Sequence, residues 1–163
     1  MKILVVSDTH GRTSDLIDII EKNKFDNVIH CGDSEVDKMM FYFDIDIVRG
    51  NSPSDDNFPD EKLITLNGLR IFITHGHNYR VDLGLRNLFQ KAKTMKADIV
   101  CFGHTHVPLI EDKEGIIFIN PGSLVRPRKK SKPSYMIIDL ENSIKITQFD
   151  KFNEEVRRYE TSY

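Results

Sequence analysis

Short runs of aliphatic and β-branched residues alternate with helical patterns along the first two-thirds of the chain. Apolar residues at helical spacing predict helices over residues 14–23, about 35–43 and 81–95. Strands that alternate with helices are typical of α/β layers. The predicted strands that carry this pattern are residues 2–6 (KILVV), 27–31 (NVIHC), 44–48 (DIDIV) and 98–102 (DIVCF).

Three hairpins are predicted among the remaining apolar runs. The first joins KLITL to LRIFIT through Asn67-Gly68, which is a strong short-range turn signal. The second joins VPLIED to GIIFIN, and the third turns at Glu141-Asn142. The charged tail from Asn153 is predicted to be a short helix or a frayed end. A plain doubly wound parallel sheet would not need three hairpins, so the pattern indicates two packed mixed sheets with helices outside.

Length and composition limit the classes of protein that fit. A chain of 163 residues with 39% hydrophobic content is predicted to form a single domain over residues 1–163. The net charge of −2 gives no general attraction to nucleic acid or to an anionic membrane. No apolar run approaches the roughly 20 residues of a membrane helix, and the N-terminus is too short in apolar residues for a signal peptide. We therefore expect a cytoplasmic protein.

Cys31 and Cys101 are expected to be reduced and buried.

Polar side chains follow five of the predicted strands. The segments are SDTHG (7–11), GD (32–33), RGN (49–51), HGH (75–77) and GHTH (103–106). Because ligands of α/β folds bind beyond the carboxyl ends of the strands, these loops are expected to meet at one edge. A single Asp or His there is more often a turn residue, but five in order along the chain favour a site. The groups collected are Asp8, His10, Asp33, Asn51, His75, His104 and His106.

Seven such groups suit two metal ions that share a bridging carboxylate and keep positions open for water. Imidazole with hard oxygen ligands, and without thiolate, indicates Mn, Fe, Ni, Co or Zn rather than Ca or a structural zinc site. Among the other histidines, His30 lies inside a strand and is expected to be a core or rim residue. The aromatic run Phe41 to Phe43 is expected in the core, although an exposed part could form a dimer face.

The motif series DTH, GD, GN, HGH and GHTH resembles the calcineurin-like metallophosphoesterase superfamily. The N-terminal start, the length and the later NPGS and RPR are most similar to its short bacterial and archaeal phosphodiesterases, which are related to the small scaffold subunit of retromer. The resemblance spans Met1 to about Phe149 and implies a four-layer α/β/β/α sandwich of two mixed sheets flanked by helices. It assigns Asp8, His10, Asp33 and His106 to one ion, and Asp33, Asn51, His75 and His104 to the other.

The activity implied is metal-dependent hydrolysis of a small phosphodiester by a metal-activated hydroxide, with Mn as the first metal and Ni, Fe, Co or Zn as alternatives. A non-catalytic scaffold, which binds a partner, and a phosphomonoesterase stay as competing interpretations. No nucleic-acid or membrane partner is predicted, and a homodimer or higher oligomer is possible. Ser52 follows Asn51 at the position where many family members have a histidine that serves as general acid. The residue that donates a proton to the leaving group is therefore not assigned.

Several residues beside the ligand loops are candidates for contact with substrate. His77 is the candidate catalytic residue, as a proton donor or a phosphate ligand, although it could simply be exposed. The basic run from Arg126 to Lys132 is expected to be a solvated loop that also allows contact with an anionic substrate. The predicted substrate-binding residues are Arg12, Arg49, His77 and Ser123.

Overall fold

The computed structural model describes residues 1–162, and of Lys38 it describes only the backbone. The chain forms a six-stranded and a five-stranded sheet. The six strands of the first sheet are β1 (Lys2–Val6), β2 (Asn27–His30), β3 (Asp46–Ile47), β9 (Ser134–Asp139), β10 (Ile144–Asp150) and β11 (Glu155–Thr161). The five strands of the second sheet are β4 (Glu61–Leu66), β5 (Leu69–Thr74), β6 (Ile99–Cys101), β7 (Leu109–Lys113) and β8 (Ile116–Asn120).

Both sheets mix parallel and antiparallel pairing. In the order β11-β10-β9-β1-β2-β3, only the pairs β1–β2 and β2–β3 are parallel, and the other three pairs are antiparallel. In the order β4-β5-β6-β8-β7, the three central strands are parallel and the two edge strands are antiparallel. All three predicted hairpins are present, and Asn67 and Gly68 have the left-handed φ values, 50° and 83°, that a tight hairpin turn requires.

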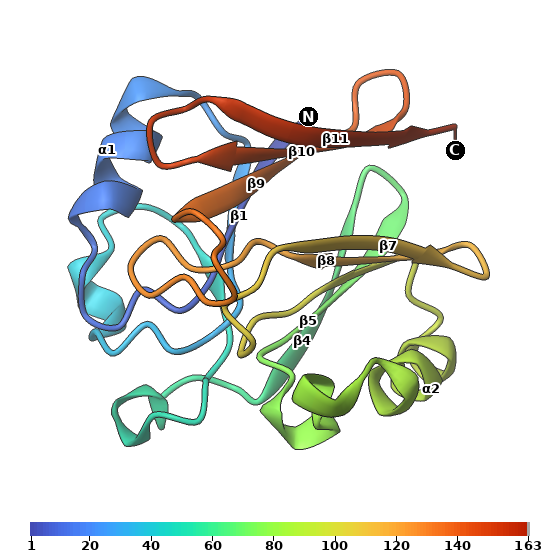
Figure 1. Cartoon of the computed structure of the whole chain (residues 1–163), viewed down its shortest axis with the longest axis horizontal. Helices are drawn as coiled ribbons and strands as arrows, with labels where there is room; N and C mark the ends of the chain where they lie inside the picture. Colours follow the sequence, from blue (N-terminus) through green and yellow to red (C-terminus); the bar gives the residue numbers. More distant parts are fainter. Residues whose placement is uncertain (163) are drawn as a thin grey trace.

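The two sheets pack face to face with a helix on each outer side (Figure 1). The helix α1 (Ser14–Lys22) packs Leu16 and Ile19 on the first sheet, and α2 (Arg86–Met95) packs Leu88 and Ala92 on the second. Alternation along β1 explains the layering, since Ile3 belongs to the cluster between the sheets while the next residue faces α1. The predicted four-layer sandwich of two mixed sheets is therefore confirmed.

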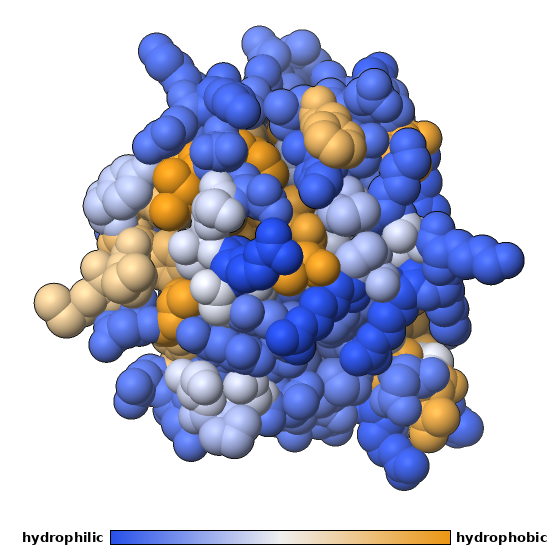
Figure 2. All heavy atoms as spheres, turned by 60° about the vertical axis from the view of Figure 1, so that its left-hand side comes forward, coloured by the Kyte–Doolittle hydropathy of each residue, from blue (hydrophilic) through white to orange (hydrophobic). Residues whose placement is uncertain are grey.

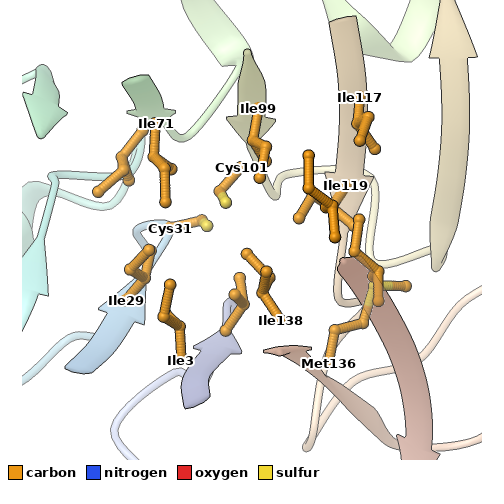
Figure 3. Packing of buried hydrophobic residues seen from close by; sticks show 14 of the residues in the cluster. Ile3, Ile29, Cys31, Ile71, Ile99, Cys101, Ile117, Ile119, Met136 and Ile138 are labelled. Atoms are coloured by element: carbon orange, nitrogen blue, oxygen red, sulfur yellow. The ribbon is translucent and has the colours of Figure 1, made fainter. Parts of the chain in front are cut away.

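The space between the sheets is filled mainly by isoleucine (Figure 3). Ile3 and Ile29 come from the first sheet, and Ile71 and Ile99 face them from the second. Cys31 and Cys101 lie in the same cluster, both buried and both free. Burial raises the pKa of the Cys31 thiol well above its usual value. The expectation of two reduced, buried cysteines is thus confirmed for the folded chain.

Two of the predicted helices are wrong in part. Residues 35–43 contain only the short 3-10 helix η1 (Lys38–Met40), because Glu35 has a left-handed φ of 56° and the Asp37 carboxylate accepts a hydrogen bond from the Met39 backbone. The helix predicted over 81–95 begins only at Arg86. It is preceded by the 3-10 helix η4 (Val81–Leu83) and by Gly84, whose φ of 125° ends regular structure there.

The tail from Asn153 is neither a helix nor a frayed end. It forms β11, which pairs antiparallel with β10. The turn between the two strands is held by Asp150, whose Oδ1 accepts hydrogen bonds from the backbone N–H groups of Phe152 and Glu154. The strand was missed because most of its side chains are exposed, so no apolar alternation marks it.

The aromatic run after η1 divides between core and surface. Phe41 is buried in the cluster beneath α1, as expected, whereas Tyr42 is 66% exposed beside the exposed Met39 and Met40. Within the described residues, no helix is long and apolar enough to cross a membrane.

Candidate metal centre

The five loops that follow the strands meet around the carboxylate of Asp8. Its Oδ1 lies 3.1 Å from Nε2 of His75 and 3.1 Å from Nε2 of His106, although these residues come from the other sheet. Its Oδ2 accepts hydrogen bonds from the Ser7 hydroxyl at 2.6 Å and from the His104 backbone at 3.1 Å. Asp8 is fully buried. The side chain predicted at the end of β1 is therefore the centre of the cluster.

The backbone is strained at most of the predicted ligands. Asp8, His10, Asp33, His104 and His106 all have left-handed φ values, between 43° and 67°. Non-glycine residues rarely adopt this conformation, and each instance costs on the order of 1 kcal/mol or more unless the surroundings impose it. Such outliers are concentrated at functional sites. Five of the seven predicted ligands share this feature, which supports a common role.

Two glycines let the ligand loops approach closely. A Cβ at Gly50 would overlap both the carboxylate and the backbone nitrogen of Asp33. A Cβ at Gly103 would overlap the Ser7 hydroxyl and lie 2.7 Å from Oδ2 of Asp8. Neither position tolerates a side chain without movement of backbone or of a predicted ligand. The glycines of the GN and GHTH motifs are thus required by packing within the site.

The hydrogen bonds of two histidines fix which ring nitrogen is free. His10 Nδ1 lies 2.7 Å from Oε1 of Glu35, and His106 Nδ1 lies 2.6 Å from the carbonyl oxygen of Arg126. A carboxylate and a carbonyl only accept, so we assign the hydrogen to Nδ1 in both rings. Their Nε2 lone pairs then face each other at 3.3 Å, beside Asp8. Two lone pairs and a carboxylate aimed at one point are the arrangement of a cation site with oriented ligands.

The donor atoms fall into two compact groups. Asp8, His10 and His106 form one, and Asp8, Asp33 and His75 form the other, with the atoms of each group within 4.8 Å of one another. Asn51 and His104 lie beside them, joined by Nδ1 of His104 and Oδ1 of Asn51 at 3.1 Å. All seven predicted ligands are therefore brought together, and their donor set of oxygen and imidazole nitrogen fits transition-metal ions. Asp8 lies close enough to the other donors to belong to both groups. The role of Asp33 as the bridging ligand stays a prediction.

The pKa values reflect this crowding. Burial by itself would raise the pKa of Asp8, but hydrogen bonds from the protonated rings of His106 and His75 and the charges of these rings outweigh it, so the pKa falls far below its usual value. Burial by itself would lower the pKa of His106, but the hydrogen bond that its protonated ring donates to Asp8, and the charge of Asp8, raise it. Burial, followed by the charge of His75, lowers the pKa values of His77 and His104. The Asp8 carboxylate is consequently ionised at neutral pH.

Glu35 and Asp55 support the cluster, and sequence reasoning missed both. Glu35 orients His10, as described above. Asp55 is fully buried and accepts four hydrogen bonds, two from Ser34, one from the Glu35 backbone and one from the Gly50 backbone. It therefore ties the loop of Asp33 to the loop of Asn51. Asp55 belongs to a loop with several acids, and no spacing rule shows which of them points inward.

The NPGS motif holds the last ligand loop. The Asn120 side chain donates to the carbonyl oxygen of Gly103 at 2.8 Å and accepts from the Gly122 backbone at 2.9 Å. Ser123 is fully buried, and its hydroxyl donates to the Asp8 carbonyl oxygen at 2.8 Å. This geometry gives Ser123 a positioning role and disfavours the predicted substrate contact.

The other predicted contact residues differ in position. Arg12 is exposed after the His10 loop. Arg49 pairs with Asp56 at 3.1 Å, so an acid already balances its charge. His77 lies at the cluster, with its Nδ1 3.0 Å from Nδ1 of His75. His30 is buried and bonded through both nitrogens, to the Thr9 hydroxyl and the Gly32 backbone, as expected of a core histidine.

The chain belongs to the calcineurin-like phosphoesterase superfamily, because the domain model of that family matches residues 1–143. The probable metallophosphoesterase YsnB of Bacillus subtilis is 36% identical over 152 residues, which cover 91% of this chain and 90% of YsnB. The phosphodiesterase MJ0936 of Methanocaldococcus jannaschii is 30% identical over 144 residues, covering 75% of this chain and 83% of the relative. The resemblance in the sequence motifs is thus confirmed.

Solved structures agree on the fold. A predicted phosphoesterase from Streptococcus pneumoniae superposes with a TM-score of 0.88 at 27% identity, and the match covers 98% of this chain and 97% of that one. Vps29 from Entamoeba histolytica, solved with Zn²⁺, superposes with a TM-score of 0.78 and covers 99% and 98% of the two chains. Its 21% identity shows a common fold and nothing further.

Figure 2 views the molecule from the left of Figure 1, and this face is mostly hydrophilic with separate hydrophobic areas.

Proposed function

We propose that the chain is a dimetal-dependent phosphodiesterase that hydrolyses a small phosphodiester with metal-activated water. The observation that carries the proposal is the orientation of the ligands. His10 and His106 each bind an outer acceptor through Nδ1. Their Nε2 atoms lie 3.3 Å apart, and that of His106 lies 3.1 Å from Oδ1 of Asp8. The family and the relative named a phosphodiesterase support the same reaction class.

The seven clustered residues would hold the metal ions, with Mn²⁺ the first expectation and Ni²⁺, Fe²⁺, Co²⁺ or Zn²⁺ the alternatives. Two divalent ions in such a site neutralise phosphate charge and activate water for in-line attack. We keep the assignment of Asp8, His10 and His106 to one ion, of Asn51, His75 and His104 to the other, and of Asp33 as the residue that would serve both. Glu35 fixes the ring of His10, and the Arg126 carbonyl fixes the ring of His106.

His77 is suited to hydrogen bonding rather than to acid catalysis. If His75 presents Nε2 to the metal centre, its Nδ1 carries the hydrogen and donates it to Nδ1 of His77. The hydrogen of His77 then lies on Nε2. Its pKa is lowered, mainly by burial, so the ring is neutral at pH 7. A neutral ring donates a hydrogen bond to a phosphate oxygen, but it is too weak an acid to protonate the leaving group.

The first test compares hydrolysis by chelated and metal-loaded protein. Chelated protein is expected to be inactive on bis(p-nitrophenyl) phosphate, and added Mn²⁺ is expected to restore turnover. Asp33→Asn should reduce the rate more than His10→Gln, because the bridging carboxylate serves both ions. Asp37→Asn, which changes an exposed acid near the same loop, is the matched control and should leave the rate unchanged.

The outcome also separates the competing functions. Equal rates for chelated and metal-loaded protein would contradict metal dependence. Faster hydrolysis of p-nitrophenyl phosphate than of the diester would make the chain a phosphomonoesterase. Tight binding of metal without turnover on either ester would favour a scaffold.

A further inference from the structure

A groove of about 440 Å³ lies beside the segment that follows His106. Val107, Pro108 and Val156 supply apolar lining. Lys130, Lys132 and Arg157 supply positive charge, and no acidic residue lines the groove within the described part of the chain. The groove therefore combines an apolar surface with a cluster of cations.

The cations of the groove are largely unbalanced. Over residues 1–162, neither Lys130 nor Arg157 has an acidic partner within 4.0 Å, since Glu155 pairs instead with Arg158 at 2.6 Å. Lys132 lies 3.6 Å from Oδ2 of Asp150, an acid that is itself almost fully buried. Arg157 is exposed, and burial of part of its side chain lowers its pKa. Cations without an acidic partner can form charge-assisted hydrogen bonds with an anionic ligand.

The groove and the metal centre share one stretch of backbone. The lining residues Val107 and Pro108 directly follow His106, a predicted ligand. The carbonyl oxygen of His106 accepts a hydrogen bond from the Arg128 backbone at 3.2 Å, which ties the basic loop to the ligand loop. The Ser131 hydroxyl lies 3.5 Å from the same oxygen and donates at 2.6 Å to the carbonyl of Arg128. The groove thus begins at the residue next to a predicted metal ligand, and the basic loop is bonded to the backbone of that ligand.

We propose that the groove binds one arm of the substrate, and that the substrate class is a nucleotide-type phosphodiester whose arm carries a ring and a second phosphate. The ring fits the apolar lining, and the second phosphate meets the cations. This inference rests on the proposed phosphodiesterase function. It differs from general binding of nucleic acid, because it concerns one terminal phosphate beside the scissile diester.

The experiment uses a pair of substrates that differ only in the second phosphate. Thymidylyl-thymidine with a 5′-terminal phosphate is compared with the same dinucleotide without it, using the metal-loaded full chain. We expect the terminal phosphate to lower KM roughly tenfold, since exposed ion pairs are individually weak but three cations act together. The double variant Lys130→Gln/Arg157→Gln should abolish the difference between the two dinucleotides. High salt should reduce the preference in the wild type.

A charge-matched control separates the groove from net charge. Lys24→Gln/Arg86→Gln also removes two exposed cations, at positions outside the groove, and should keep the preference. Equal KM values for the two dinucleotides, or the same loss in both double variants, would overturn the inference while leaving diester hydrolysis intact. If the chain cleaves no diester, the proposed function fails. Titration of the chelated protein with the phosphorylated dinucleotide then tests binding by the groove separately from hydrolysis. Binding that is lost in Lys130→Gln/Arg157→Gln supports the inference, and absence of binding to the wild type refutes the inference.

Discussion

Asp55→Asn is expected to destabilise the fold and to loosen both sides of the metal centre. Oδ1 of Asp55 accepts from the Ser34 hydroxyl at 3.0 Å and from the Glu35 backbone at 2.8 Å. Oδ2 accepts from the backbone N–H groups of Ser34 at 3.1 Å and Gly50 at 2.9 Å. Asparagine has nearly the same shape, so the change creates no cavity. It replaces one acceptor oxygen by an NH₂ group. At the Oδ2 position this group would face two backbone N–H donors, whereas at the Oδ1 position it faces the Glu35 N–H and the Ser34 hydroxyl, which can turn to accept.

The magnitude follows from the orientation that leaves only the Glu35 N–H without an acceptor. A buried donor left without an acceptor costs about 1–3 kcal/mol, so the variant is expected to lose about 2 kcal/mol of unfolding free energy. For a chain of this size, the melting temperature should fall by roughly 6 °C. Asp56→Asn is the matched control, because it makes the same chemical change at the next residue. The Asp56 side chain is 64% exposed and pairs with Arg49, so the loss should be below about 1 kcal/mol.

Urea unfolding of chelated protein measures the two variants without a contribution from bound metal. A second measurement is the affinity for Mn²⁺, which should weaken in Asp55→Asn because the loops of Asp33 and Asn51 are no longer tied together. Equal stability of the two variants would refute the argument. So would a large loss in Asp55→Asn with unchanged Mn²⁺ affinity, since the carboxylate would then stabilise the fold without organising the site.

Two further predictions concern histidines. Burial lowers the pKa of His30 to about 4, against 6.5 in the unfolded chain. The unfolded chain therefore binds the extra proton between these values, so the stabilisation is complete above pH 6.5 and falls by about 3 kcal/mol toward pH 4. Urea unfolding at pH 7 and pH 4 should show a smaller difference in His30→Gln, and an equal difference would contradict the assignment. Without an acid after Asn51, kcat should depend steeply on leaving-group pKa, with aryl diesters cleaved readily and alkyl diesters slowly, because acid catalysis contributes about 10²–10⁴-fold. Ser52→His should flatten that dependence, whereas a shallow wild-type slope that steepens in His77→Asn would make His77 the proton donor.

The ligand residues could be predicted because each follows a strand that the apolar pattern marks clearly. β1, β2, β5 and β6 are short apolar runs. Parallel pairing brings the carboxyl ends of β1 and β2 to one edge of the first sheet, and those of β5 and β6 to one edge of the second. The Asn67-Gly68 turn likewise has a local signal that fixes a hairpin. In both cases the residues that determine the structure lie close together in the sequence, so the local sequence pattern is sufficient to predict that structure.

The supporting residues could not be predicted, because their roles depend on contacts distant in sequence. Glu35 lies 25 residues from His10, and Asp55 lies 21 residues from Ser34. The local pattern places Glu35 at the start of a helix, and Asp55 is one of several acids in its loop, so only the tertiary hydrogen bonds show the role of either residue. Arg157 was missed for a related reason, since β11 has no apolar alternation and its place beside Lys130 follows from pairing with β10.

Titration of the chelated chain with Mn²⁺ tests the central claim most directly. We predict two ions bound per chain, with both affinities weakened in Asp33→Asn and neither weakened in Asp56→Asn. A single bound ion, or two ions whose affinities are unaffected by Asp33→Asn, would contradict a dimetal centre bridged by that carboxylate.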